Sequence, residues 1–411
     1  MRRVVITGLG AVSPLGSTVE KMWNGMTEGR CAIDKVTRFD TSALKVHLAA
    51  EVRDFDPLTC MEKSDLRKTD LYVQYAMGAA TQAMAQSGLE GKIAPERLGV
   101  YIGSGIGGIL TFVAECDKVH EKGVGRVSPF FIPMIISNMA AGKVAMRFQA
   151  MGPTLPVVTA CATSSHTIGE AFRAIAHGYA DAIIAGGSEA SMAPMAMSGF
   201  ANMQALTTAE DPTQASIPFD ARRSGFVMGE GAGVLVLEEY EHAKARGAEI
   251  LGEICGYGNT CDAYHITSPR PDALGAANAI RQAVSEAGFD GSEELYINAH
   301  GTSTPPNDRT ETLAIKSALG EDWAYKASVS STKSMTGHML GAAGAIEAIA
   351  CVLALREGII PPTIGYREKD PECDLDITPN EAVRRPVTAA LSTSLGFGGH
   401  NACLALRKFE E

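Results

Sequence analysis

Short runs rich in valine and isoleucine recur along the chain and alternate with longer segments of helical periodicity. The runs predict strands at residues 3–7, 98–102, 154–158, 181–186, 233–238, 249–258, 294–299, 326–331, 389–394 and 402–407. Helical periodicity predicts helices over residues 66–87, 162–177, 272–287, 309–319 and 338–356. Continuously apolar strands alternating with helices are typical of sheets covered on both faces. The pattern therefore predicts an α/β protein with a largely parallel sheet.

The order of elements repeats once within the chain. The stretch VVTACATSSHTIGEAFRAI, from residue 157, reads as a strand, a cluster of small residues and a helix. About 170 residues later, ASVSSTKSMTGHMLGAAGAIEAI follows the same plan. This weak duplication predicts two similar halves, which we place at residues 1–250 and 251–411.

Composition and charge narrow the class of protein. The 411 residues are 45% hydrophobic and 20% charged, as in ordinary globular proteins, and the net charge of −11 argues against nucleic-acid binding. The nine cysteines are scattered without a CxxC pair, which fits a reducing cytosol. Glycines interrupt the apolar N-terminal run, and Glu347 interrupts the apolar stretch at 339–355. We therefore expect a soluble, cytoplasmic protein without a signal peptide or a membrane span.

Cys161 is the first candidate for chemistry. It lies where an apolar strand ends and a helix begins, among threonines, serines and alanines too small to cover it. Unpaired N–H groups at a helix N-terminus stabilise a thiolate and can lower the thiol pKa. The backbone N–H of the cysteine itself could serve an oxygen that develops charge in acyl transfer. The alternative is a buried, inert cysteine, but the small neighbours favour a nucleophile.

Two further segments place histidines after predicted strands. His300 opens the hydroxyl-rich stretch HGTSTPPND, at a strand end where α/β sheets bind ligands. Lys333 and His338 follow the next strand, in SSTKSMTGHM. Each could be purely structural. The two histidines lack the spacing of a zinc pair, so we expect no metal.

Two glycine-rich stretches have different interpretations. In LGFGGHNA, from residue 395, the glycines allow a tight turn that could offer a second oxyanion donor, although a plain turn is equally compatible. GSGIGG at 103–108 matches the dinucleotide fingerprint, but no strand ending in an acidic residue follows at the required distance. We therefore expect the second stretch to line a narrow apolar channel.

Taken together, the motifs TAC, NAHGTSTP, SSTKSMTGH and GFGG resemble those of the beta-ketoacyl-acyl-carrier-protein synthases, over essentially the whole chain. The likeness is strongest to the elongating, synthase II type of bacterial fatty acid synthesis. The resemblance implies a thiolase-like fold of two duplicated halves in a five-layered αβαβα arrangement, and a homodimer. It also implies acyl carrier protein as partner, with substrates carried on its 4′-phosphopantetheine, and no further cofactor.

The resemblance also implies the roles of individual residues. Cys161 would accept the acyl group, with its own N–H and that of Phe397 as the oxyanion hole. His300 and His338 would hold the malonyl thioester oxygen while CO2 leaves, and Lys333 would orient them. The expected pocket residues are Ile106, Phe131 (across a dimer interface), Phe200, Thr302 and Thr304. The expected supporting acids are Asp308 and Glu347. The expected basic cluster for docking of the carrier protein is Lys63, Arg67 and Lys68. An equally good interpretation is that these three residues only form a solvent-exposed, charged helix face.

Three positions near the end depart from the family pattern: Thr393, Leu395 and His400 stand where asparagine, phenylalanine and often threonine are expected. They could change the motion of the gate or the preferred chain length. Among rival functions, a thiolase lacks support because Cys403 is not part of a C-x-G motif. A polyketide ketosynthase has the same catalytic residues, so this function remains an alternative. A non-catalytic chain-length partner would lack Cys161.

Overall fold

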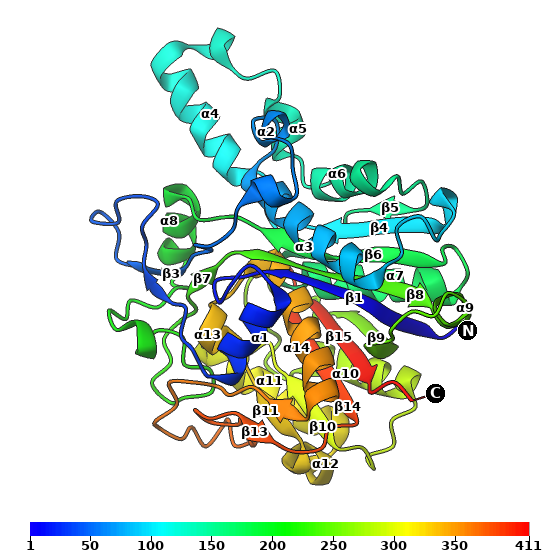
Figure 1. Ribbon diagram of the computed structural model, residues 1–411. Coiled ribbons are helices and arrows are strands. Elements are labelled where there is room, and N and C mark those ends of the chain that lie inside the picture. Colours follow the sequence, from blue (N-terminus) through cyan, green and yellow to red (C-terminus); the bar gives the residue numbers. More distant parts are fainter. Residues whose placement is uncertain (411) are drawn as a thin grey trace.

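Ten strands form one mixed sheet across the whole molecule (Figure 1). The computed structural model describes residues 1–410. The strand order is β11-β10-β14-β15-β9-β1-β8-β6-β4-β5. In chain order these strands are β1 (Val4–Val12), β4 (Leu98–Gly103), β5 (Thr154–Leu155), β6 (Ala182–Glu189), β8 (Gly231–Glu239), β9 (Gly252–Cys261), β10 (Leu295–Asn298), β11 (Ser328–Ser330), β14 (Ala389–Gly396) and β15 (His400–Arg407). All ten predicted strands are present, although β5 is shorter than predicted.

The sheet consists of two copies of one five-strand topology. In each half the strands lie in the order third, second, fourth, fifth, first: β5-β4-β6-β8-β1 and β11-β10-β14-β15-β9. The two halves also agree in which strands are parallel. Strands β5, β4 and β6, like β11, β10 and β14, run parallel, and the two strands that follow them in each half-sheet run antiparallel to their neighbours. Strands β1 and β9 then join the halves antiparallel. The predicted duplication is confirmed.

Side chains alternate between an inner and an outer core along each strand. On β6, Ile183 faces the central core and Ile184 the outer core of the first half. On β15, Leu404 faces the central core and Cys403 the outer core of the second half. This alternation follows from the period of two in an extended strand. Both faces of each half-sheet are thus buried, which explains why the strands read as continuous apolar runs.

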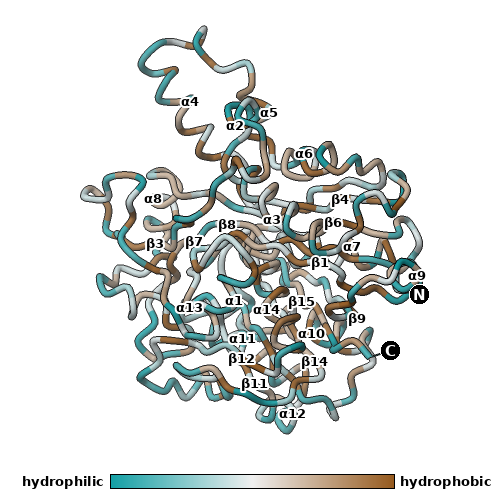
Figure 2. The backbone as a smooth tube through the Cα atoms, viewed as in Figure 1, coloured by the Kyte–Doolittle hydropathy of each residue, from teal (hydrophilic) through white to brown (hydrophobic). Residues whose placement is uncertain are grey.

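Helices cover these faces and complete five layers. Helices α3 (Leu71–Ser87) and α6 (Met139–Phe148) contribute to the outer core of the first half, and α10 (Leu274–Ala287) and α11 (Pro305–Leu319) to that of the second. Between the half-sheets lie α7 (Thr163–Ala176) and α14 (Ala343–Glu357), which contact each other. The layers are therefore αβαβα, as expected. Hydrophobic segments dominate the middle of the molecule in Figure 2.

Helix α14 is buried around almost its whole circumference. It contacts β8 of one half-sheet and β14 of the other. A helix that touches sheets on two sides needs apolar residues on every face, which explains its run of alanine, isoleucine and valine. Its one buried acid, Glu347, therefore requires a partner inside the core.

An arm after β4 was not predicted from the sequence. It consists of α4 (Ile109–Lys122), η3 (Val124–Arg126) and α5 (Phe131–Ile135), and it projects from the body at the top of Figure 1. None of the residues in these three elements is buried. The first turns of α4 nevertheless carry apolar residues at helical spacing, because Ile109, Leu110 and Val113 pack in part against the core. The sequence therefore contained a signal for this helix that was missed.

The remaining elements are short. They are α1 (Val19–Thr27), β2 (Asp34–Lys35), β3 (Leu48–Ala50), η1 (Pro57–Thr59), α2 (Lys63–Leu66), η2 (Pro95–Arg97), η4 (Ala160–Ala162), α8 (Pro194–Asn202), η5 (Pro212–Gln214), β7 (Met228–Gly229), α9 (Tyr240–Ala245), α12 (Glu321–Lys326), α13 (Lys333–Thr336), η6 (Leu340–Ala342), β12 (Ile359–Ile360) and β13 (Val383–Arg384).

Candidate active site

Cys161 lies in a strained turn at the start of α7. The turn η4 begins with Ala160 at φ 52°, a left-handed conformation that is uncommon for residues other than glycine. The second half repeats this turn as η6 before α14, where Leu340 has φ 48° and Gly341 takes the position of Cys161. Only the first copy of the duplicated turn therefore carries a thiol.

The two histidines face each other. His300 follows β10 and His338 follows α13, and their ring centroids are 5.2 Å apart with the planes at 86°. The backbone N–H of Leu340 donates to Nδ1 of His338 at 3.2 Å. Because that nitrogen accepts, the proton of the neutral ring is on Nε2. His338 is thus a hydrogen-bond donor at Nε2.

Burial keeps both imidazoles neutral. It lowers the pKa of His300 and of His338 well below the usual 6.5, and the charge of Lys333 lowers both pKa values further. Lys333 itself is buried and forms an ion pair with Glu347 of α14. Burial raises the pKa of Glu347, and the lysine opposes that shift. The pair thus fixes a positive charge beside two neutral donors.

The thiol of Cys161 is protonated at rest. Burial raises its pKa to about 12, while Lys333 and the backbone N–H of Phe397 act in the opposite direction. This is the reverse of the lowered pKa that the helix start suggested, because desolvation in the buried turn outweighs the favourable dipoles. The backbone N–H of Phe397 is close enough to lower the pKa of the thiol, which places one donor near the reacting atom.

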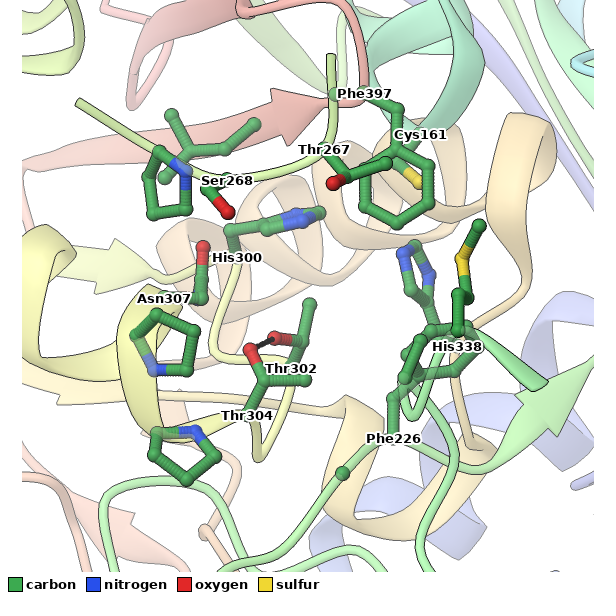
Figure 3. Close-up of a pocket in the computed structure, with 18 of the residues that line it drawn as sticks. Cys161, Phe226, Thr267, Ser268, His300, Thr302, Thr304, Asn307, His338 and Phe397 are labelled. Carbon is green, nitrogen blue, oxygen red and sulfur yellow. Dashed lines mark hydrogen bonds between the residues drawn. The ribbon is translucent and has the colours of Figure 1, made fainter. Parts of the chain in front are cut away.

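One cavity of about 220 Å³ brings these groups together (Figure 3). Most of the expected catalytic and pocket residues line it: Cys161, Phe200, His300, Thr302, Thr304, His338 and Phe397. The hydroxyls of Thr302 and Thr304 are hydrogen-bonded to each other at 2.9 Å. The cavity is lined on one side by Thr267 and Ser268 of the long loop after β9. A chain that enters past these hydroxyls would reach the thiol.

Two of the expected pocket residues lie elsewhere in this chain. Ile106 is 39% exposed in the loop after β4, and it does not line the cavity. Phe131 begins α5 in the projecting arm, where it lies against Phe112 with ring centroids 6.1 Å apart. The structure of one chain therefore leaves both outside the space around Cys161.

Buried acids hold the loop that carries His300. Asp308 accepts hydrogen bonds from the backbone N–H groups of Phe219 and Ser303, and burial raises its pKa to about 6. Glu311, one turn further along α11, accepts from the N–H groups of His300 and Gly301, each at 2.7 Å. Sequence analysis missed Glu311, although its spacing of three from Asp308 puts both acids on one face of the helix.

The GSGIGG stretch encloses an anion supplied by the chain itself. The buried carboxylate of Glu189 accepts from Ser104 Oγ at 3.0 Å and from the N–H groups of Gly105 and Ile106 at 2.9 and 3.3 Å. The N–H of Gly341 in the second half adds a bond of 3.0 Å. The amides of Gly105 and Ile106 thus bind a carboxylate, as backbone nests do. None of these glycines lines the cavity around Cys161, and the apolar channel stays a prediction.

The basic cluster Lys63, Arg67 and Lys68 lies at α2 and just after it, and all three side chains are exposed. Within residues 1–410 none of the three forms an ion pair, whereas the neighbouring Asp65 pairs with Lys143 at 3.4 Å. Lys68 lies over the ring of Phe130 in the projecting arm, at 5.7 Å. The cluster is thus free to meet an acidic partner.

Among residues 1–410 there is no group of three or more histidine, cysteine, aspartate or glutamate side chains arranged to hold a metal ion. Over the same residues, no helix combines the length and the apolarity needed to cross a membrane.

A duplicated five-layered fold with one cysteine and two histidines in a common cavity defines a ketosynthase-type centre. Two family models match the chain: "Beta-ketoacyl synthase, N-terminal domain" over residues 1–243 and "Beta-ketoacyl synthase, C-terminal domain" over residues 251–367. The chain belongs to the beta-ketoacyl synthase family.

Similar proteins span the full chain. It is 49% identical over 411 residues to 3-oxoacyl-[acyl-carrier-protein] synthase 2 of Synechocystis, and 50% identical over 410 residues to the protein of the same name in Staphylococcus aureus. Each match covers 100% of this chain and 99% of the relative.

Solved ketosynthases share the fold over their whole length. The ishigamide ketosynthase/chain length factor has a TM-score of 0.93 at 37% identity. A type II polyketide ketosynthase bound to its acyl-carrier protein has a TM-score of 0.92 at 34% identity. Both matches cover 100% of this chain and 100% of the solved chain.

Proposed function

We propose that the chain is an elongating 3-oxoacyl-acyl-carrier-protein synthase, which extends a fatty acyl group by two carbons from malonyl-acyl-carrier protein. One observation carries this proposal: a thiol, a backbone oxyanion donor and two neutral imidazoles share one cavity. The relatives at 49–50% identity carry the name of that activity.

The first step is transfer of the acyl group to Cys161. Its sulfur attacks the thioester carbonyl of acyl-carrier protein, a new C–S bond forms, and the bond to pantetheine sulfur breaks. The proton of the thiol leaves with the pantetheine sulfur. The N–H groups of Cys161 and Phe397 stabilise the oxyanion that develops in between, and Lys333 favours the thiolate.

The second step is loss of CO2 from the malonyl thioester. The C–C bond to the carboxylate breaks and its electron pair becomes the enolate of the thioester. Because that electron pair comes from the broken C–C bond, no side chain has to remove a C–H proton. His338, protonated on Nε2, and His300 donate to the enolate oxygen and stabilise its charge. The carbanion then attacks the acyl carbonyl on Cys161, and the C–S bond breaks to release the 3-ketoacyl product.

The carrier protein is the proposed partner, and pantetheine the proposed carrier of both substrates, with no other cofactor. Thr302 and Thr304 line the cavity, and we assign their hydroxyls to hydrogen bonds with the amides of the pantetheine arm. The exposed, unpaired cations of Lys63, Arg67 and Lys68 are the proposed dock for an acidic carrier protein. In support, one solved ketosynthase is bound to its acyl-carrier protein.

A homodimer is the proposed assembly. Strand β5 is an edge of the ten-stranded sheet, and the exposed apolar side chains Met151, Leu155 and Val158 lie on it or beside it. An exposed apolar edge strand is a template for pairing with another chain. In the proposed dimer, Phe131, which begins α5 in the projecting arm, would line the cavity of the other copy. Sedimentation should give a dimer, and Leu155→Arg should give monomers.

The proposed location is the cytoplasm. All nine cysteines are free, and four of them, including Cys161 and Cys351, are buried as thiols. Free thiols in such number are typical of a reducing compartment.

The test of the function is a reconstituted reaction. The purified chain receives saturated acyl-carrier proteins of graded length together with malonyl-carrier protein, and the products are read by mass. Products longer by two carbons support an elongating synthase and give its range of lengths. No product from any primer, with folded enzyme and competent carrier, would refute it.

A polyketide ketosynthase is the second candidate, because two solved chains of that kind match at 34–37% identity. The same reaction separates the candidates. A fatty acid synthase stops after one extension when no reducing enzyme is present, whereas a polyketide synthase adds further malonyl units to the unreduced product.

A further inference from the structure

We propose that Thr393 is a positioning residue that holds His300, through its hydroxyl group, for the decarboxylation step. The inference rests on the proposed function. It goes beyond that function because Thr393 is not among the residues that line the cavity.

The topology brings Thr393 to the point where His300 leaves the sheet. Strands β10 and β14 are parallel neighbours, and Ser392 pairs with Asn298, the last residue of β10. Thr393 is therefore one residue beyond the end of β10, beside the segment that turns into the loop 299–304. Parallel strands place such residues together at the carboxyl edge of a sheet.

The hydrogen bonds of Thr393 connect that segment to a buried acid. Its Oγ1 donates to Glu311 Oε1 at 2.6 Å and accepts from the backbone N–H of His300 at 3.2 Å. The same N–H also donates to Glu311 Oε1 at 2.7 Å. His300, Thr393 and Glu311 thus form a closed triangle in the core, in which each pair shares a direct bond.

The triangle supplies a restraint that the ring of His300 lacks. Its Nδ1 is buried and has no hydrogen-bond partner within residues 1–410, whereas Nδ1 of His338 is held by the N–H of Leu340. The hydrogen bonds that fix the position of His300 are therefore those of its backbone N–H, which donates to Glu311 and Thr393, while the ring itself only packs against His338. Without the hydroxyl, Glu311 loses the hydrogen bond from Thr393, and the N–H of His300 keeps only its bond to Glu311. The ring of His300 can then shift within the cavity.

The test uses Thr393→Val, which keeps the shape and removes the hydroxyl, and Thr393→Ser, which keeps the hydroxyl. Thr7→Val is a matched control, because Thr7 is also buried and donates to a buried carboxylate, Glu238, at 2.9 Å. We expect Thr393→Val to lower kcat for malonyl decarboxylation roughly tenfold, with KM nearly unchanged and acylation of Cys161 at the normal rate. Thr393→Ser should restore kcat.

Equal kcat values in Thr393→Val and Thr7→Val would overturn the proposal, and so would equal losses in acylation and decarboxylation. If the valine variant does not fold, Thr393→Ala removes the same hydroxyl without a second methyl group. The imidazole signals of His300 in NMR spectra test the positioning even if the wild type condenses nothing. They should move in Thr393→Val and stay in Thr7→Val; signals that stay in both would refute it.

Discussion

The rings of His300 and His338 lie nearly perpendicular, with centroids 5.2 Å apart, and both are buried. Each comes from the second half of the chain, whereas Cys161 comes from the first. The cavity therefore exists only because the duplicated halves pack face to face through α7 and α14. In the proposed mechanism one half supplies the nucleophile and the other the histidine donors, so we expect mutations to remove acyl transfer and decarboxylation separately.

Replacing Cys161 by alanine should abolish acylation and leave malonyl decarboxylation measurable. The substitution removes the attacking sulfur, but it does not touch the hydrogen bonds that hold the histidine pair. Intact-protein mass after incubation with acyl-carrier protein checks the first part, and CO2 release the second. Retained acylation, or loss of all carrier binding, would contradict the assignment.

The variant His338→Ala should lose decarboxylation and keep acylation of Cys161. The enzyme should still gain an acyl group on Cys161, and decarboxylation should fall at least about a hundredfold, as expected for loss of one preorganised donor. His177→Ala is the control, because His177 is exposed after the end of α7. A normal rate of CO2 release in His338→Ala would show that the donor lies elsewhere.

The pH dependence of the two steps should differ. The pKa of His300 and of His338 is lowered, so both rings stay neutral, and CO2 release by Cys161→Ala should be constant from about pH 8 to about pH 6. The pKa of Cys161 is raised to about 12, so its thiolate fraction and its alkylation rate in the wild type should rise about tenfold per pH unit over that range. A decarboxylation profile that drops with a midpoint near 6.5 would mean a histidine with an ordinary pKa.

Charge reversal in the basic cluster should weaken binding of the carrier protein. The double variant Arg67→Glu, Lys68→Glu turns attraction of an acidic partner into repulsion, and the loss should shrink as salt is added. Lys92→Glu with Lys408→Glu changes the net charge equally at two other exposed lysines. Binding by titration calorimetry decides the matter: equal affinity in both double variants would remove the cluster from consideration.

A stability prediction concerns the contact of β1 with α3. A Cβ added at Gly10 would lie 1.8 Å from the carbonyl oxygen of Ala79, so Gly10→Ala must push the helix from the sheet. We expect a loss of about 3 kcal/mol in the free energy of unfolding. Gly142→Ala in α6 meets no atom of residues 1–410 within 4 Å and should stabilise by about 0.5 kcal/mol. Thermal unfolding of both variants checks the pair, and equal midpoints would contradict this packing.

The predictable parts of the molecule were those with a strong local signal. Strands buried on both faces appear in the sequence as apolar runs. The same order of strand, small residues and helix around Cys161 and around Lys333 indicated the duplication. The arm was missed although Ile109, Leu110 and Val113 give the start of α4 a helical spacing of apolar residues; α5, with 5 residues, is too short to show a period.

The electrostatics of the site could not be read from the sequence for a different reason. The raised pKa of Cys161 depends on how deeply the turn is buried, and the role of Glu311 depends on bonds to Thr393, which is 82 residues away. Such quantities arise only when distant segments meet.

The most direct test of the account follows the carboxyl carbon of malonyl-carrier protein labelled with ¹³C at that position. With an acyl-carrier primer, the wild type should release one labelled CO2 for each 3-ketoacyl product, and the product should carry no label. Cys161→Ala should release labelled CO2 without product. Label retained in a condensed product, or product formed by the Cys161→Ala variant, would contradict the central claim that decarboxylation drives attack on an acyl group at Cys161.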